Sequence, residues 1–144
     1  MKSATVLTLA ICLLSFSLAK AQAPRSPAAP SGTKPTESKT VKNVGVDEFD
    51  KLRADKKNVV LDVRTPAEFA AGHLPGAVNL DFNASDFEAK VAALDKKKVY
   101  LVHCASGGRS AKACDKMSKL SFLSLYNLEG GFKAWEKAGK SVEK

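Results

Sequence analysis

The chain has 144 residues, 26% charged and 44% hydrophobic, a composition that fits one globular domain with appendages rather than several domains. Its formal net charge is +8, but no arginine-rich stretch alternates with aromatic residues, so nucleic-acid binding is not expected. The three cysteines are too few for a disulfide-rich scaffold, and no Cys or His pairs have zinc-site spacing. We therefore expect no structural metal and no cofactor.

The first 21 residues have the pattern of a secretory signal peptide. Lys2 precedes an uncharged, Leu- and Ala-rich run at 5–19, and Ala19-Lys20-Ala21 forms a small-x-small cleavage site. The run is shorter than the ~20 apolar residues of a membrane-spanning helix. We expect cleavage after Ala21, a periplasmic or secreted protein, and no stable membrane insertion afterwards; an uncleaved anchor is the alternative. Cys12, in the middle of the run, is expected to leave with the peptide.

Residues 22–40 are predicted to form a disordered tether. They contain four prolines among Ala, Ser, Thr and Lys, with no aromatic residue and no apolar periodicity. Such a segment cannot bury enough surface to offset the entropy of ordering it. Residues 41–144, about a hundred, remain for one compact domain.

Within 41–144, short β-branched runs alternate with helical patterns. Strands are predicted at 59–63, 77–80, 99–103 and within 123–128, with a further edge strand at 41–44. This alternation predicts an α/β fold of three layers, in which a mostly parallel central sheet is flanked by helices. In such sheets, ligands bind beyond the carboxyl ends of the strands.

Four predicted helices are recognised by apolar residues at helical spacing. Their apolar faces are Val46, Phe49 and Leu52; Phe87, Val91 and Leu94; Ala113, Met117 and Leu120; and Phe132 with Trp135, the last helix ending near Gly139. Asp47 is placed to cap the first helix, and Ser85-x-x-Glu88 is a capping-box pattern for the second.

The segment between the 99–103 strand and the third helix carries the candidate chemistry. Cys104-Ala105-Ser106-Gly107-Gly108-Arg109 follows directly on His103, and a helix is expected to open at about Ser110. Adjacent glycines permit a tight turn that directs backbone N–H groups toward one point, and a helix N-terminus adds positive potential. The pKa of a cysteine at such a site falls below its free value. The alternative is a buried structural cysteine beside a glycine turn.

The sequence resembles the rhodanese superfamily in four segments, in the family's order, that together span most of 44–139. The segments are Leu61-Asp62-Val63-Arg64-Thr65-Pro66-Ala67-Glu68-Phe69, Gly72-His73-Leu74-Pro75-Gly76-Ala77-Val78-Asn79, Val102-His103-Cys104 to Arg109, and Glu129-Gly130-Gly131-Phe132-Lys133-Ala134-Trp135. The resemblance implies a rhodanese-like fold and a sulfurtransferase that takes a sulfane sulfur from thiosulfate or a persulfide. Cys104 would carry the sulfur as a persulfide and pass it to a thiol, to cyanide or to a protein acceptor.

The resemblance also assigns the residues around the sulfur. The backbone amides of Ala105, Ser106, Gly107, Gly108 and Arg109 would hold the outer sulfur, Arg109 would favour a small anionic donor, and Asp62 and Arg64 would border the pocket. An ion pair with Glu68, four residues further on, is the structural alternative for Arg64. His73 is expected to be a packing residue, and the side chain of His103 is expected to point away from the loop.

Loop length separates the chemistries of related proteins. Cys104 to Arg109 is a six-residue loop, whereas phosphatases and arsenate reductases of this fold have one residue more, so the resemblance argues against phosphatase activity. Ser121 stands where many relatives have glycine. A left-handed serine there would cost about 1–2 kcal/mol, so a differently shaped helix end is expected.

Two further functions remain open at this stage. One is a persulfide carrier or partner-binding module with negligible turnover. The other is a thiol redox role in which Cys104 pairs with Cys114. For Cys114, a half-buried core thiol is the default, and a disulfide requires the two Cα atoms to come within about 7 Å.

Overall fold

The computed structural model describes residues 39–144. The predicted signal peptide (1–21) and nearly all of the predicted tether (22–40) lie outside the described residues, and the first strand begins at Thr40. No helix within residues 39–144 is long and apolar enough to cross a membrane.

Strands and helices alternate along the whole described segment. In chain order they are β1 (Thr40–Val44), α1 (Val46–Ala54), β2 (Val59–Asp62), α2 (Pro66–Ala71), β3 (Val78–Asn79), α3 (Phe87–Ala92), β4 (Val99–His103), α4 (Gly108–Lys119), β5 (Ser124–Leu128) and α5 (Gly131–Lys137). The sheet order is β1-β5-β4-β2-β3, and every pairing is parallel. The predicted α/β class is confirmed, and the five strands lie where the β-branched runs placed them.

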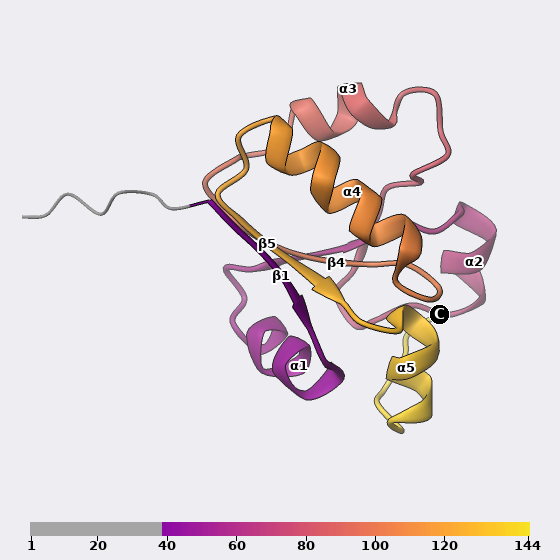
Figure 1. Cartoon of the computed structure of the whole chain (residues 1–144). Helices are drawn as coiled ribbons and strands as arrows, with labels where there is room; N and C mark the ends of the chain where they lie inside the picture. Colours follow the sequence, from indigo (N-terminus) through magenta and orange to yellow (C-terminus); the bar gives the residue numbers. More distant parts are fainter. Residues whose placement is uncertain (1–38) are drawn as a thin grey trace, which may run out of the picture. The chain divides into compact units, whose positions relative to one another are not determined.

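Helices cover both faces of the sheet, α3 and α4 on one side and α1 and α5 on the other (Figure 1). Each side has its own apolar cluster. Met117 and Ala113 of α4 pack with Phe87 and Val91 of α3 on the first face. On the second face, Phe49 of α1 packs with Trp135 of α5. Burial of these side chains holds the carboxyl ends of β2, β4 and β5 together, where the predicted site lies.

Two predicted helix caps are wrong. Helix α1 begins at Val46, so Gly45 occupies the cap position and Asp47 lies inside the first turn. Helix α3 begins at Phe87 with Asp86 as its cap residue, and its start has no side-chain cap hydrogen bond. At both positions the carboxylates still favour the helix start through its dipole.

A capping box does form at α2, a helix that apolar periodicity did not predict. The Thr65 hydroxyl accepts from the Glu68 backbone N–H, and the Glu68 carboxylate accepts from the Thr65 backbone N–H at 3.0 Å. Pro66 occupies the first helical position, where its missing N–H costs nothing. The signal for this short helix is therefore Thr-Pro-x-Glu rather than an apolar face.

The end of α4 also differs from the expectation. Ser121 adopts a left-handed conformation with φ of 70°, although it is not glycine. Its N–H donates to Ser118 O at 3.2 Å, and the Phe122 N–H donates to Met117 O at 3.3 Å, the two bonds of a Schellman motif. Phe122 is fully buried in the cluster that contains Met117, and this contact offsets the strain at Ser121.

Candidate active site

Cys104 lies at the carboxyl edge of the sheet, immediately after β4. The parallel register places His103 of β4 beside Asp62 of β2, so the residues that follow these strands meet at one edge. The chain then turns through Gly107, which has a positive φ of 98° and precedes the first residue of α4, Gly108. The strand–loop–helix arrangement predicted around Cys104 is present, with the helix opening two residues earlier than expected.

The Cys104 sulfur is surrounded by hydrogen-bond donors. The Gly107 N–H donates to it at 3.1 Å, and the Ser110 hydroxyl lies 3.5 Å from it. The same hydroxyl lies 3.1 Å from Gly107 O, so its single hydrogen can be donated either to the Cys104 sulfur or to this carbonyl oxygen. Cys104 is 1% exposed, so the thiol is almost completely shielded from solvent.

These donors favour the thiolate. Burial raises the pKa of the Cys104 thiol, but hydrogen bonds from the Ser110 side chain and from the backbone N–H groups of Ser110, Ser106 and Gly107 outweigh it. The pKa of Cys104 is therefore lower than that of an ordinary thiol. A thiolate is the nucleophilic form of cysteine, and a lowered pKa raises the fraction of thiolate at a given pH.

The start of helix α5 forms hydrogen bonds with the backbone carbonyl groups of the loop. The Phe132 N–H donates to Cys104 O at 2.7 Å, and the Lys133 N–H donates to Ala105 O at 3.0 Å. This approach requires Gly131, since a Cβ there would lie 2.4 Å from Cys104 O. With its carbonyl groups directed at α5, the loop presents N–H groups to the sulfur.

Arg109, the last loop residue, forms a two-pronged ion pair with Glu68 of α2. One terminal nitrogen donates to one carboxylate oxygen at 2.9 Å, and the other nitrogen donates to the second oxygen at 2.8 Å. The pKa of Glu68 is lowered to about 2, mainly by the hydrogen bond from Arg109. Partial burial opposes this shift, and hydrogen bonds from Thr65 add to it. The structural partner of Glu68 is thus Arg109, and the alternative pairing of Glu68 with Arg64 is wrong.

Asp62 and Arg64 form a buried pair beside the loop. Arg64 donates to both Asp62 oxygens, at 2.6 Å in the shortest contact, and to Gly72 O at 2.7 Å. Its guanidinium stacks 4.0 Å from the centre of the Phe132 ring. Asp62 is 0% exposed and Arg64 4%, so the pair ties β2 to the turn at Gly72 and to α5. The expectation that Asp62 and Arg64 border the donor pocket stays a prediction.

The two histidines are packing residues in the structure. His103 is fully buried near Phe49 and Phe132, on the face of the sheet that α1 and α5 cover. Burial, against the attraction of Asp62, lowers its pKa to about 4. His73 stacks on Phe69 with ring centres 3.8 Å apart.

Cys114 is a core thiol. It is 1% exposed on α4, within the same apolar cluster as Cys104, and both cysteines are free. Burial raises the pKa of Cys114 to about 12. The pKa values of the two thiols are therefore shifted in opposite directions, although the residues lie only ten apart in sequence.

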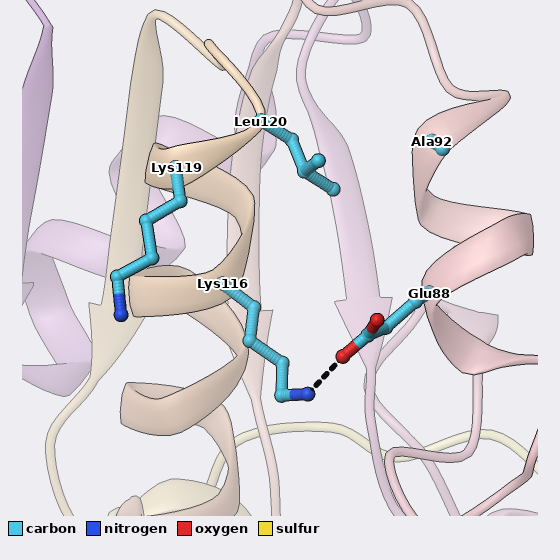
Figure 2. A pocket seen from close by; sticks show the side chains of 5 residues that line it. All are labelled: Glu88, Ala92, Lys116, Lys119 and Leu120. Carbon is cyan, nitrogen blue, oxygen red and sulfur yellow. Dashed lines mark hydrogen bonds and ion pairs between the residues drawn. The ribbon is translucent and has the colours of Figure 1, made fainter.

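A pocket of about 370 Å³ lies between α3 and α4, away from this chemistry. Its lining residues are Glu88, Ala92, Lys116, Lys119 and Leu120 (Figure 2). A rise of about 1.5 Å per residue puts Lys116 roughly 12 Å along the α4 axis from Gly108. Lys116 pairs with Glu88 across the pocket, and Lys119 pairs with Asp115.

Two contributors to the site were not predicted from sequence. The sequence predicts Ser110 only as the approximate helix start, although a hydroxyl one turn after a cysteine loop is a recognisable donor. For Glu68, the sequence suggests only a pairing with Arg64. Its position next to Arg109, 41 residues away, depends on β2 and β4 being neighbours in the sheet.

Comparison with known proteins agrees with this geometry. The family model for the rhodanese-like domain matches residues 45–138. A sulfurtransferase of Allochromatium vinosum is 31% identical over 103 residues, covering 71% of this chain and 94% of its own. The thiosulfate sulfurtransferase GlpE of Pseudomonas aeruginosa is 32% identical over 99 residues, covering 68% and 86%.

Solved structures agree as well. The crystal structure of a rhodanese-related protein from Thermoplasma volcanium matches with a TM-score of 0.63 and 30% identity, covering 71% of this chain and 97% of its own. A rhodanese-like domain protein from Staphylococcus aureus matches with a TM-score of 0.60 and 30% identity, covering 72% and 99%. With the cysteine loop, the parallel sheet and these matches together, the chain belongs to the rhodanese-like domain family.

Proposed function

We propose that the protein is a rhodanese-type sulfurtransferase that carries sulfane sulfur on Cys104. The observation that supports this most directly is the ring of donors around the sulfur, from Gly107 and Ser110 in particular. The relatives named as sulfurtransferases support the same class of reaction.

The proposed reaction has two displacement steps. The Cys104 thiolate attacks the outer sulfur of the donor, and a new S–S bond forms as the donor's S–S bond breaks. With thiosulfate, the electron pair leaves on sulfite, and Cys104 becomes a persulfide. An acceptor thiolate or cyanide then attacks the outer sulfur, and the electron pair of the broken bond restores the Cys104 thiolate. Charge and atoms balance in both steps without an added oxidant.

The loop donors suit this cycle because they stabilise negative charge on sulfur in both resting forms. The Gly107 N–H and the Ser110 hydroxyl meet the thiolate in the free enzyme. Loop N–H groups would meet the outer sulfur of the persulfide, which also carries negative charge. Fixed donors need no reorganisation when charge moves from one sulfur to the next.

The test is thiosulfate:cyanide activity of the purified protein beside a Cys104→Ser variant. Thiocyanate production is expected from the wild type and not from Cys104→Ser. Cys114→Ala is the matched control, since this second buried thiol lies on α4 and has its pKa raised to about 12. Equal thiocyanate production by Cys104→Ser and wild type would refute the proposal.

A second candidate is a persulfide carrier or partner-binding module with slow turnover. The 1% exposure of Cys104 favours it, because a buried persulfide would be protected from free acceptors. Mass spectrometry after incubation with a donor distinguishes the two. A carrier would retain one added sulfur atom on Cys104 in the presence of cyanide, whereas the enzyme would lose it.

The proposed location of this reaction is outside the cytoplasm, on the basis of residues 1–21 alone. Intact mass of the protein recovered from extracytoplasmic fractions tests this. A chain beginning at Gln22 is expected, whereas an intact N-terminus in the membrane fraction would support the uncleaved anchor.

A further inference from the structure

Arg109 is the only cationic side chain in the loop from Cys104 to Arg109, and its charge is already compensated by a carboxylate. Both terminal nitrogens donate to Glu68, at 2.9 and 2.8 Å. The hydrogen bonds to Glu68 raise the pKa of Arg109 against partial burial, and the negative charges of Cys104 and Asp81 act in the same direction. The guanidinium is therefore coupled electrostatically to the reacting sulfur, but it faces carboxylates.

Glu68 holds this position independently of Arg109. One of its oxygens accepts from the Thr65 backbone N–H and from the Thr65 hydroxyl, each at 3.0 Å. These are capping-box contacts at the start of α2, so the carboxylate is oriented by its own helix. Arg109 thus meets a pre-positioned anion rather than a flexible surface side chain.

Other cations near the loop do not replace Arg109. Lys112 on α4 lies three residues after Arg109, and Lys133 on α5 donates its backbone N–H to Ala105 O. The side chains of both lysines are exposed to solvent, where charges are screened. A donor that approaches Cys104 therefore meets backbone N–H dipoles and a guanidinium whose charge is compensated by Glu68.

We infer that Glu68 is a specificity-determining residue that, by compensating Arg109, disfavours dianionic sulfur donors relative to donors of lower charge. The inference rests on the proposed sulfurtransferase function and names the donor class of the same site. A persulfide or another monoanionic sulfane compound would be favoured over thiosulfate. The chain would then differ in donor preference from a homologous loop with an uncompensated arginine.

A matched pair of donors isolates this effect of charge. Methanethiosulfonate has the same outer sulfur as thiosulfate, but a methyl group replaces one charged oxygen. Attack by the Cys104 thiolate releases sulfite from the dianion and methanesulfinate from the monoanion, and both reactions leave the same persulfide. The ratio of the two kcat/KM values therefore reports how the site responds to the extra charge.

The experiment is this ratio, measured in wild type and in Glu68→Gln with cyanide as acceptor. Glutamine still completes a capping box, so the fold of α2 is retained while the carboxylate charge is removed. The ratio of thiosulfate to methanethiosulfonate kcat/KM is expected to rise roughly fivefold in Glu68→Gln, mainly through a lower KM for thiosulfate. This factor is the size expected for one extra charge contact near a protein surface.

Two controls complete the design. The double variant Glu68→Gln/Arg109→Gln removes both charges and should return the ratio to near its wild-type value. Glu88→Gln removes a carboxylate that pairs with Lys116 at the other end of α4 (Figure 2), and it should leave the ratio unchanged.

The outcomes separate this inference from the proposed function. If wild type transfers sulfur from neither donor, the proposed function fails, and the inference fails with it. If both donors react and Glu68→Gln slows them equally, Glu68 has a structural role only and the inference alone is overturned. A selective gain for thiosulfate that the double variant cancels supports the inference.

Discussion

The backbone N–H of Phe132 donates a 2.7 Å hydrogen bond to the carbonyl oxygen of Cys104. The chain thus uses the start of α5 to orient the loop that surrounds the reactive sulfur, although the two segments lie on either side of β5 in sequence. Because the carbonyl is engaged on the α5 side, the following amide groups are free to face the sulfur. The C-terminal Gly130-Gly131-Phe132 signature therefore contributes to the candidate active site, through the backbone rather than through a side chain.

The first prediction concerns Gly131. A Gly131→Ala change places a Cβ 2.4 Å from Cys104 O at a residue with φ of 58°. Strain and overpacking together are expected to lower the free energy of unfolding by about 3 kcal/mol and to reduce sulfur transfer strongly. Urea denaturation and the thiocyanate assay measure the two effects.

Gly139→Ala is the control for that change. Gly139 has a similar φ of 69°, but a Cβ there meets nothing within 4 Å, so only the backbone strain remains, about 1 kcal/mol. Equal losses of stability in Gly131→Ala and Gly139→Ala would contradict the packing of α5 against the loop.

The second prediction concerns Ser110. Removing its hydroxyl in Ser110→Ala takes one donor from the Cys104 sulfur, so the pKa of Cys104 is expected to rise toward the ordinary thiol value. Thiolate absorbance at 240 nm, titrated in a Cys12→Ser background, measures this directly. Cys114 does not interfere, because its pKa is raised to about 12.

Ser118→Ala is the matched control on the same helix. The Ser118 hydroxyl donates to Asp115 O on the exposed side of α4, away from the loop. Its loss should leave the titration of Cys104 unchanged. A Ser110→Ala curve that overlays the wild-type curve would show that the backbone N–H groups alone stabilise the thiolate.

Much of the fold follows from local pattern. The β-branched runs at 59–63 and 99–103 predict buried strands because a parallel sheet covered on both faces requires apolar residues at consecutive positions. The helix faces follow from apolar spacing in the same way. The predicted caps at Asp47 and Ser85 are wrong by one or two residues. Helix α1 has Gly45 at its cap position, and helix α3 has Asp86 at its cap position.

The site is predictable as far as it is local. Cys104, Gly107 and the following helix are contiguous, so their geometry follows from the loop sequence. The two ion pairs differ in this respect. Arg64 pairs with Asp62, only two residues away on the same segment. Arg109 pairs with Glu68, 41 residues away, and this contact depends on β4 and β2 being neighbours in the sheet. A spacing of four residues between Arg64 and Glu68 suggests an ion pair between them. In the structure, the Glu68 carboxylate instead accepts from the Thr65 N–H of the capping box and pairs with Arg109.

The third prediction concerns Ser121, the only non-glycine residue with positive φ in the part of the chain that the structure describes. Ser121→Gly relieves the left-handed strain and is expected to raise the free energy of unfolding by about 1 kcal/mol, since the gain exceeds the added flexibility of the unfolded chain. Ser118→Gly, inside the helix, should instead lower it by about 0.5 kcal/mol. A destabilised Ser121→Gly variant would contradict the Schellman geometry at this helix end.

The last prediction is a pH dependence that arises from His103. Its folded-state pKa is about 4, against 6.5 for an unperturbed histidine, mainly because burial disfavours the charged ring. Asp62 attracts the proton from 3.6 Å, and Arg64 opposes it. Between pH 6.5 and 4 the unfolded chain therefore binds a proton that the folded chain does not, so stability falls as pH decreases through this window. The shift corresponds to about 3 kcal/mol for this fully buried group.

The comparison variant is His103→Asn, which keeps a small polar side chain and removes the titration. Wild type should lose about 3 kcal/mol more than His103→Asn between pH 7 and 4 in urea denaturation. The contribution of Glu68 falls in a separate window, because its lowered folded pKa of about 2 gives stability that is present above pH 4.5 and lost as pH falls toward 2. Glu68 is present in both proteins, so its effect cancels. Parallel pH profiles for the two proteins would show that His103 is not held neutral by burial.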